Sequence, residues 1–263
     1  MRGHYSHCVS FEVSADAYTR FMGRFSEPLA TEFLGLVDPR PGQRVLDVGS
    51  GPGALTALLV ERYGADDVCA VDPSESFVAA ARKAFPGVDV RRAGAEALPF
   101  ADGSFDAALA ELVVQFMTDP VAGLREMGRV TRPDGVVAAC VWDHAEGGRG
   151  PLSLFWEAVR EFDPEQLGET DYAGTGEGQL AELCSAAGLV EPESHTLTVR
   201  VGFETFEQWW QPFTLGVGPP GDYVAGLDET ARDALRDECA SRLPPAPFEL
   251  AVSAWGVTAR RAG

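Results

Sequence analysis

The feature that most restricts the fold of this chain is an alternation of short apolar runs with longer helical stretches between residues 44 and 143. The runs are apolar almost throughout, as expected of strands covered by helices on both faces. Alternating strands and helices predict right-handed β–α–β units in a parallel sheet. The expected strands are residues 44–49, 68–72, 88–93, 106–112 and 136–144, and the expected helices are 54–64, 74–85 and 119–131.

The remainder of the chain predicts additions to this core. Residues 197–203 and 248–260 alternate polar and apolar side chains, which indicates two antiparallel strands at a sheet edge. We therefore expect an α/β, Rossmann-like, doubly wound sheet of seven strands, mostly parallel, with an antiparallel last strand. The expected parts are a helical lead-in or lid at 1–43, a core at 44–203, an inserted cap at 204–247 and the last strand at 248–263.

Composition excludes several classes of partner. Forty acidic against 21 basic residues give a net charge of −19, which opposes binding to nucleic acid or to anionic lipid. The five cysteines have no CxxC spacing, so neither a disulfide framework nor a metal site is expected. The sequence shows no signal peptide and no apolar stretch of about 18 residues. We expect a cytoplasmic protein without a membrane span that acts on a small molecule; the oligomeric state stays open.

The segment VLDVGSGPG, which starts at Val45, is the strongest local signal. A strand, three glycines and a helix allow positive φ angles and let a ligand approach the end of the strand. Gly49, Gly51 and Ala54 also satisfy the GxGxxA pattern of dinucleotide sites, and Asp72 follows at the distance of a ribose-binding acid. The glycines alone therefore leave the ligand open.

The charge of Asp47 separates the two interpretations. It ends the strand below the glycine loop. A carboxylate about 6 Å from a cation, at an effective dielectric of about 20, attracts it by about 3 kcal/mol and repels a phosphate equally. The site thus favours a nucleoside that carries positive charge, and S-adenosylmethionine (SAM), with its sulfonium and ammonium groups, is such a ligand.

Four motifs in order extend this argument: VLDVGSGPG, AVDPS, AEALPFADGSFDA and LREMGRVTRPDG. Together they resemble the class I SAM-dependent methyltransferases, and most closely the small-molecule branch that includes the ubiquinone and menaquinone biosynthesis methyltransferases. The resemblance covers about residues 42–144. One departure concerns the adenine side, where the family usually has Asp-Ala-Glu and this chain has Gly94-Ala95-Glu96.

The resemblance implies roles at matching positions. Asp72 would accept the ribose hydroxyls, and Glu111 and Leu112 would line the methyl-transfer region. Arg24 would meet the cofactor carboxylate, with Tyr18 closing over the site. The full set of expected cofactor contacts is Tyr18, Arg24, Asp47, Gly49, Ser50, Gly51, Asp72, Pro73, Ser74, Phe77, Ala95, Glu96, Glu111 and Leu112.

The acceptor is expected between the lead-in and the cap. His144, just after the last core strand, is the candidate general base, if the acceptor needs one. The candidate acceptor-lining residues are aromatic: Phe21, Phe25, Trp142, Trp209, Trp210, Phe213 and Tyr223. Three functions are left: a small-molecule methyltransferase that converts SAM to S-adenosylhomocysteine, an NAD-dependent oxidoreductase, and a SAM-binding module without catalysis.

Overall fold

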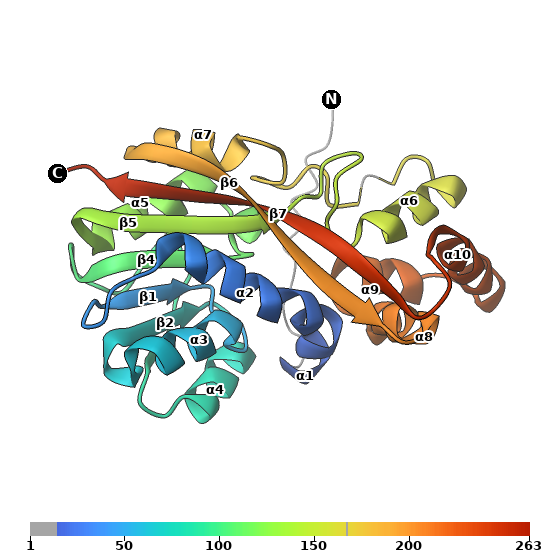
Figure 1. Ribbon diagram of the computed structural model, residues 1–263, viewed down its shortest axis with the longest axis horizontal. Coiled ribbons are helices and arrows are strands. Elements are labelled where there is room, and N and C mark those ends of the chain that lie inside the picture. The colour runs from blue at the N-terminus through green and yellow to red at the C-terminus, as the bar shows by residue number, and fades with distance from the viewer. Residues whose placement is uncertain (1–14, 167) are drawn as a thin grey trace.

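A computed structural model describes residues 15–166 and 168–263 of the chain. Within this part, seven strands form one sheet in the order β3-β2-β1-β4-β5-β7-β6 (Figure 1). The strands are β1 (Val45–Val48), β2 (Val68–Asp72), β3 (Asp89–Arg92), β4 (Phe105–Glu111), β5 (Thr131–Trp142), β6 (Leu189–Phe203) and β7 (Phe248–Arg261). The first five pair in parallel, and β7 is antiparallel to both β5 and β6. The expected Rossmann-like sheet with an antiparallel last strand is confirmed.

Helices cover both faces of the sheet, which explains why its strands are apolar throughout. Alternate side chains of each core strand point to opposite faces, so that Val45 joins one hydrophobic core and Leu46 the other. The first core includes residues of α2 (Arg24–Val37), α3 (Ala54–Tyr63) and α4 (Glu75–Ala84). The second includes residues of α5 (Pro120–Val130) and α7 (Gln179–Ala186).

The two helical additions meet near the carboxyl end of the core strands. The lead-in comprises α1 (Ala15–Tyr18), a π-helical turn at Thr19–Gly23 and α2, whose Phe25, Leu29 and Phe33 are buried. Strands β6 and β7 run on past the other strands to α8 (Phe206–Trp210), α9 (Gly218–Ala225) and α10 (Glu229–Arg242) (Figure 1). The helix α6 (Ser153–Phe162) packs against α10.

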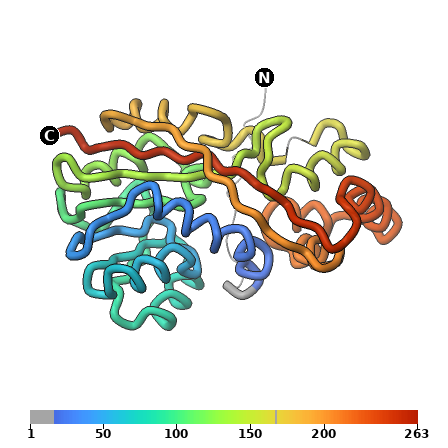
Figure 2. The backbone as a smooth tube through the Cα atoms, in the orientation of Figure 1, coloured from blue at the N-terminus to red at the C-terminus, as the bar shows by residue number. Residues whose placement is uncertain are grey.

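The backbone trace shows β6 and β7 side by side, from these helices at one end to the C-terminus at the other (Figure 2). Their register joins Leu189 to Arg261 and Phe203 to Phe248. In the described part of the chain, no helix is both long and apolar enough to cross a membrane.

Candidate functional site

The glycine loop between β1 and α3 has one closed and one open position. Gly49 has a φ of 72°, and a side chain there would collide with Val113. Gly51 has a φ of 54°, but a Cβ at this position would meet no atom within 4 Å. The backbone thus leaves free space above Gly51, where a ligand can approach it closely.

The N–H groups of this loop are already bonded within the protein. Gly49 and Ser50 donate to the carbonyl of Val71, at 2.8 and 2.9 Å, and Gly53 donates to the carbonyl of Ser50 at 2.9 Å. Gly51 donates to Oδ2 of Asp72 at 2.9 Å. A dinucleotide site uses such N–H groups for the pyrophosphate, so the geometry opposes the oxidoreductase alternative.

Asp47 has a partner that the sequence did not predict. It is 1% exposed, and its Oδ2 accepts a hydrogen bond of 2.5 Å from the hydroxyl of Thr56 in the first turn of α3. The backbone N–H of Thr56 also donates to this carboxyl. The carboxyl of Asp47 therefore occupies the helix N-terminus, where a phosphate would otherwise bind. Burial, with a smaller contribution from Asp72, raises the pKa of Asp47 to about 7.

Asp72 lies at the end of β2, as expected, and is 5% exposed. Its Oδ1 accepts from the N–H of Ser74 at 2.8 Å, while Oδ2 accepts from Gly51. Burial raises its pKa against these two hydrogen bonds. Each carboxylate oxygen can accept a second hydrogen bond, so Asp72 keeps acceptor capacity for ligand hydroxyls.

The residues after Asp72 form one wall of the same region. Pro73 leads into Ser74, which caps the N-terminus of α4, and its hydroxyl accepts from the N–H of Phe77. Phe77 is 4% exposed and packs against Tyr18, with 5.5 Å between ring centroids. Tyr18 is half-buried and its pKa is raised, by burial first and then by three acids: Glu111, Asp72 and Glu169. The structure thus places Tyr18 between the cofactor candidates and the interior of the site.

Glu111 ends β4 and Leu112 follows it, on the other side of the site. Within the described residues, the buried Oε1 of Glu111 has no hydrogen-bond partner, and the same holds for the hydroxyl of Ser50. Burial and the nearby Asp47 raise the pKa of Glu111 well above its ordinary value. Leu112 has a φ of 60°, which turns the chain at the strand end.

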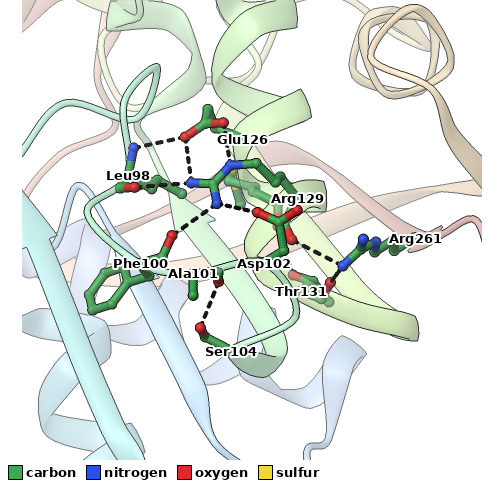
Figure 3. Close-up of polar contacts among 10 residues, drawn as sticks. Leu98, Phe100, Ala101, Asp102, Ser104, Glu126, Arg129, Thr131 and Arg261 are labelled. Carbon is green, nitrogen blue, oxygen red and sulfur yellow. Dashed lines mark hydrogen bonds and ion pairs between the residues drawn. The ribbon is translucent and has the colours of Figure 1, made fainter.

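Arg129 of α5 forms hydrogen bonds and ion pairs that hold the adenine-side loop, residues 93–104, in place (Figure 3). Its guanidinium donates to the carbonyls of Leu98 and Phe100, at 3.0 and 2.9 Å, and contacts Asp102 and Glu126. Two of the four sequence motifs, AEALPFADGSFDA and LREMGRVTRPDG, are therefore in contact in the structure.

The same loop carries both adenine candidates. Ala95 is 7% exposed, and Oε1 of Glu96 accepts from the N–H of Thr118 at 2.8 Å. That oxygen therefore already has one partner within the protein, and the adenine contact of Glu96 stays a prediction.

Arg24 does not join the other cofactor candidates. Its guanidinium lies 4.8 Å from the ring of Phe203 and donates to the carbonyl of Gly202 at 3.4 Å. The side chain is therefore directed to the end of β6, because an electron-rich ring and a free carbonyl are nearby partners there.

A cavity lies between the core, the lead-in and the inserted segment; we call it the acceptor cavity. It encloses about 480 Å³ of atom-free space, part of it open to solvent. Two unpartnered polar atoms belong to residues of its wall, Oε1 of Gln115 and Nε1 of Trp142. Its lining residues are Tyr18, Phe21, Met22, Leu112, Gln115, Phe116, Trp142, His144, Leu152, Glu169 and residues 217–220.

Only some of the predicted aromatic residues reach this cavity. Phe21 and Trp142 line it, whereas Phe25 packs behind Trp142, 6.5 Å away between centroids. The other four, Trp209, Trp210, Phe213 and Tyr223, do not line it and form ring contacts within the helical part instead. Burial of large rings in a small helical segment explains this outcome.

His144 lies where the sequence predicts it, and it has a partner that the sequence did not reveal. Nε2 of His144 is 3.8 Å from Oε2 of Glu169, and both side chains are buried. Oε2 also accepts from Nε1 of Trp156 at 3.3 Å. Burial lowers the pKa of His144 to about 4 and raises that of Glu169 to about 7. Glu169 belongs to an irregular loop without a motif, so no sequence signal indicated it.

These features fit SAM. Asp47, Asp72 and Glu111 gather at the strand ends, and none of the groups that shift their pKa values in the described chain is a cation. A positively charged ligand would compensate these acids. Asp72 would hold the ribose, Gly51 leaves room for the ligand, and Ser50 and Glu111 offer unpartnered polar atoms.

Fold and site together define a class I SAM-dependent methyltransferase domain. Residues 46–139 match the family described as "Methyltransferase domain", so this segment of the chain belongs to that family.

Two curated relatives and one solved structure illustrate the likeness. A demethylmenaquinone methyltransferase of Beutenbergia cavernae is 37% identical over 125 residues, which are 48% of this chain and 50% of that protein. An uncharacterized methyltransferase of Mycobacterium tuberculosis is 36% identical over 157 residues, 59% of this chain and 61% of the relative. This chain thus spans only about half to three-fifths of these relatives. In fold, the chain resembles Haemonchus contortus phosphoethanolamine N-methyltransferase 2 in complex with SAM, with a TM-score of 0.60 and 17% identity over 97% of this chain and 59% of that one.

Proposed function

We propose that this protein transfers a methyl group from SAM to a small-molecule acceptor bound in the acceptor cavity. The observation that carries the proposal is the convergence of Asp47, Asp72 and Glu111 beside an open glycine position, with no cation among the groups that act on them. Such a site favours a nucleoside with positive charge over a diphosphate.

The chain's own residues would bind and orient both reactants. Asp72 would hold the ribose, the wall of Phe77 and Pro73 would flank the base, and Ser50 and Glu111 would face the methionine part. When bound, SAM supplies a methyl group on an activated sulfonium carbon. Leu112, which follows the proposed cofactor residue Glu111, lines the acceptor cavity, which favours a catalyst over a binding module. Positioning of this kind contributes up to about 7–11 kcal/mol of barrier lowering.

The acceptor is proposed to be small and not anionic. The net charge of −19 opposes nucleic acid, and among the described residues none of those that line the cavity is an arginine or a lysine. We also propose residues 204–247 as a cap, since residues 217–220 close one side of the cavity.

Calorimetric titration tests the cofactor. SAM and S-adenosylhomocysteine should bind the protein, whereas NADH should not. The Asp72→Ala variant should bind SAM at least about tenfold more weakly, because charge-assisted hydrogen bonds are lost. Asp66→Ala, an exposed acid outside the site, is the matched control. Saturation by NADH without binding of SAM would refute the proposal.

A further inference from the structure

His144 and Glu169 stand between two cavities. Both residues line the acceptor cavity, and both also line a second, smaller cavity with about 270 Å³ of atom-free space, part of it open to solvent, which we call the outer cavity. The lining of the outer cavity includes the polar side chains of Ser153, Glu157 and Arg160. The pair therefore belongs to the lining of both cavities.

The pair is held in place by the helix α6 and by burial. His144 is 7% and Glu169 is 5% exposed. Trp156 of α6 donates to Oε2 of Glu169, the same oxygen that faces Nε2 of His144 at 3.8 Å. A buried imidazole and a buried carboxyl are costly to keep in a core without a polar ligand, which indicates that the wall serves a reaction in the cavity.

Other titratable groups face the pair without neutralising it. Tyr18 of the lead-in and Tyr172 of the adjacent loop both interact with Glu169 through its charge. On the outer side, Glu157 and Arg160 are the charged groups of the cavity lining. The two tyrosines stay neutral near pH 7, because burial and Glu169 raise both pKa values, that of Tyr172 to about 12.

We propose that His144, with Glu169 as its partner, removes a proton from the acceptor's attacking atom during methyl transfer. The acceptor is therefore an apolar molecule whose nucleophile carries a removable proton, a hydroxyl or an amine, rather than a thioether. This inference rests on the proposed function and deepens it.

The step balances as follows. The acceptor atom forms a bond to the methyl carbon with its electron pair, and the carbon–sulfur bond breaks with its electrons going to sulfur. The acceptor's proton moves to the neutral imidazole of His144, and the carboxylate of Glu169, which lies beside Nε2, stabilises the resulting imidazolium. The proton then leaves by way of the outer cavity, which His144 and Glu169 also line.

The neutral state of His144 suits this role. Burial lowers the pKa of His144 to about 4, so its imidazole is unprotonated at neutral pH; burial also raises the pKa of Glu169 to about 7, so the charge that stabilises the imidazolium develops as the pH rises through that value. We therefore expect the rate of methyl transfer to rise as the pH increases through about 7.

Methylation of a matched naphthalene series tests the inference. The probes are 2-naphthol, 2-naphthylmethylamine, 1-nitro-2-naphthol, which is already ionised at neutral pH, and methyl 2-naphthyl thioether, which has no removable proton. The proteins are the wild type, His144→Gln and Glu169→Gln, with His195→Gln as the matched control. His195 is bonded to Thr258 on the β6–β7 pair and does not line either cavity.

We expect His144→Gln and Glu169→Gln to bind SAM normally but to methylate 2-naphthol or the amine about 10²-fold more slowly. The loss should shrink to less than about tenfold for 1-nitro-2-naphthol, since no base is then needed. Glu169→Gln keeps an oxygen for Trp156, so it should fold, and it should lose the rise in rate near pH 7. His195→Gln should behave as the wild type.

Failure of this inference differs from failure of the proposed function. Absence of SAM binding by the wild type would refute both. If SAM binds normally, three outcomes would overturn only the proton-transfer role. These are turnover of the thioether alone, no turnover of any proton-bearing probe, and a pH profile that is unchanged in both variants.

Discussion

Gly51 and Gly42 form a matched pair for testing the cofactor site at the level of single residues. Both have positive φ angles, 54° and 81°, and a Cβ at either position would meet no atom within 4 Å. Substitution by alanine therefore costs a similar backbone strain, about 1 kcal/mol, at both positions. Only Gly51 adjoins Asp72.

We predict that Gly51→Ala weakens SAM binding at least about tenfold, because the methyl group enters the space left for the ligand. Gly42→Ala should lower the melting temperature by about as much as Gly51→Ala does, but it should leave the affinity for SAM unchanged. Calorimetry and thermal unfolding measure both quantities. Equal affinity in the two variants would show that the open space at Gly51 is not used.

The sequence predicted single residues best where a motif fixes the backbone. Asp72 ends an apolar strand and is followed by a helix cap, so the local sequence pattern predicts its position at the carboxyl end of the parallel strands. The bond from Asp47 to Thr56 was not predicted, because it depends on the direction in which α3 leaves the loop. Glu169 was missed entirely, since only tertiary packing brings an irregular loop against His144.

At the scale of elements, Arg129 links α5 to the adenine-side loop. One guanidinium satisfies the carbonyls of Leu98 and Phe100 and contacts Asp102 and Glu126 (Figure 3). Glu126 in turn accepts from the N–H of Leu98 at 3.0 Å. Removal of the arginine would leave several of these polar groups without a partner.

We predict that Arg129→Ala destabilises the fold by about 1–3 kcal/mol, because half-buried hydrogen-bonding groups lose their partner. The SAM affinity should also fall, since the loop that carries Ala95 loses its support. Arg125, exposed one turn earlier on α5, is the control and should have no effect when changed to alanine. Urea unfolding and calorimetry test this, and an unchanged stability of Arg129→Ala would contradict it.

Several of the aromatic residues that we expected at the acceptor site pack against one another within the inserted segment. Trp209 is 3% exposed and lies 4.9 Å from Phe213 between ring centroids, and neither residue lines the acceptor cavity. Composition alone cannot distinguish a ring that contacts a ligand from one that fills a core, because both need the same apolar surface.

We therefore predict that Trp209→Ala lowers stability by about 3–5 kcal/mol, the usual cost of emptying a core site of this size. SAM affinity of the folded fraction should stay unchanged. Phe206, which is half-buried beside Trp209, is the matched aromatic control, and Phe206→Ala should lower the stability by less than Trp209→Ala does. A variant of normal stability would instead favour a direct role of Trp209 in acceptor binding.

At the scale of the whole molecule, the alternation of strands and helices predicted the parallel core of the sheet, and the alternation of polar and apolar residues in 248–260 predicted its antiparallel last strand. The cavity could not be predicted in the same way, because its wall combines residues from 18 to 220, contributed by the lead-in, the core and the inserted segment. Such a surface has no periodicity in sequence. Its charge, however, follows from the acidic composition, which supplies buried carboxyls without arginine or lysine beside them.

This charge distribution predicts how stability depends on pH. Asp47 and Glu169 have pKa values of about 7 in the fold, above their ordinary values of 3.8 and 4.5. The folded state therefore holds protons that the unfolded chain has already lost, and the stability that they contribute is lost as the pH rises through 7. The lowered pKa of His144 affects the stability of the fold only below about pH 6.5, the ordinary pKa of histidine. Most surface acids are ionised throughout this range.

Between pH 6.5 and about pH 8, the melting temperature of the protein without ligand should therefore fall, by several degrees. SAM should oppose this change, because its positive charge compensates the ionised acids, and its affinity should increase over the same range. Asp47→Asn should flatten both dependences, while Asp66→Asn, at an exposed position, should not. Thermal unfolding at several pH values, with and without SAM, measures the effect. Because a phosphate ligand would strengthen the repulsion instead of relieving it, an affinity that falls with increasing pH would argue against a cationic cofactor at this site.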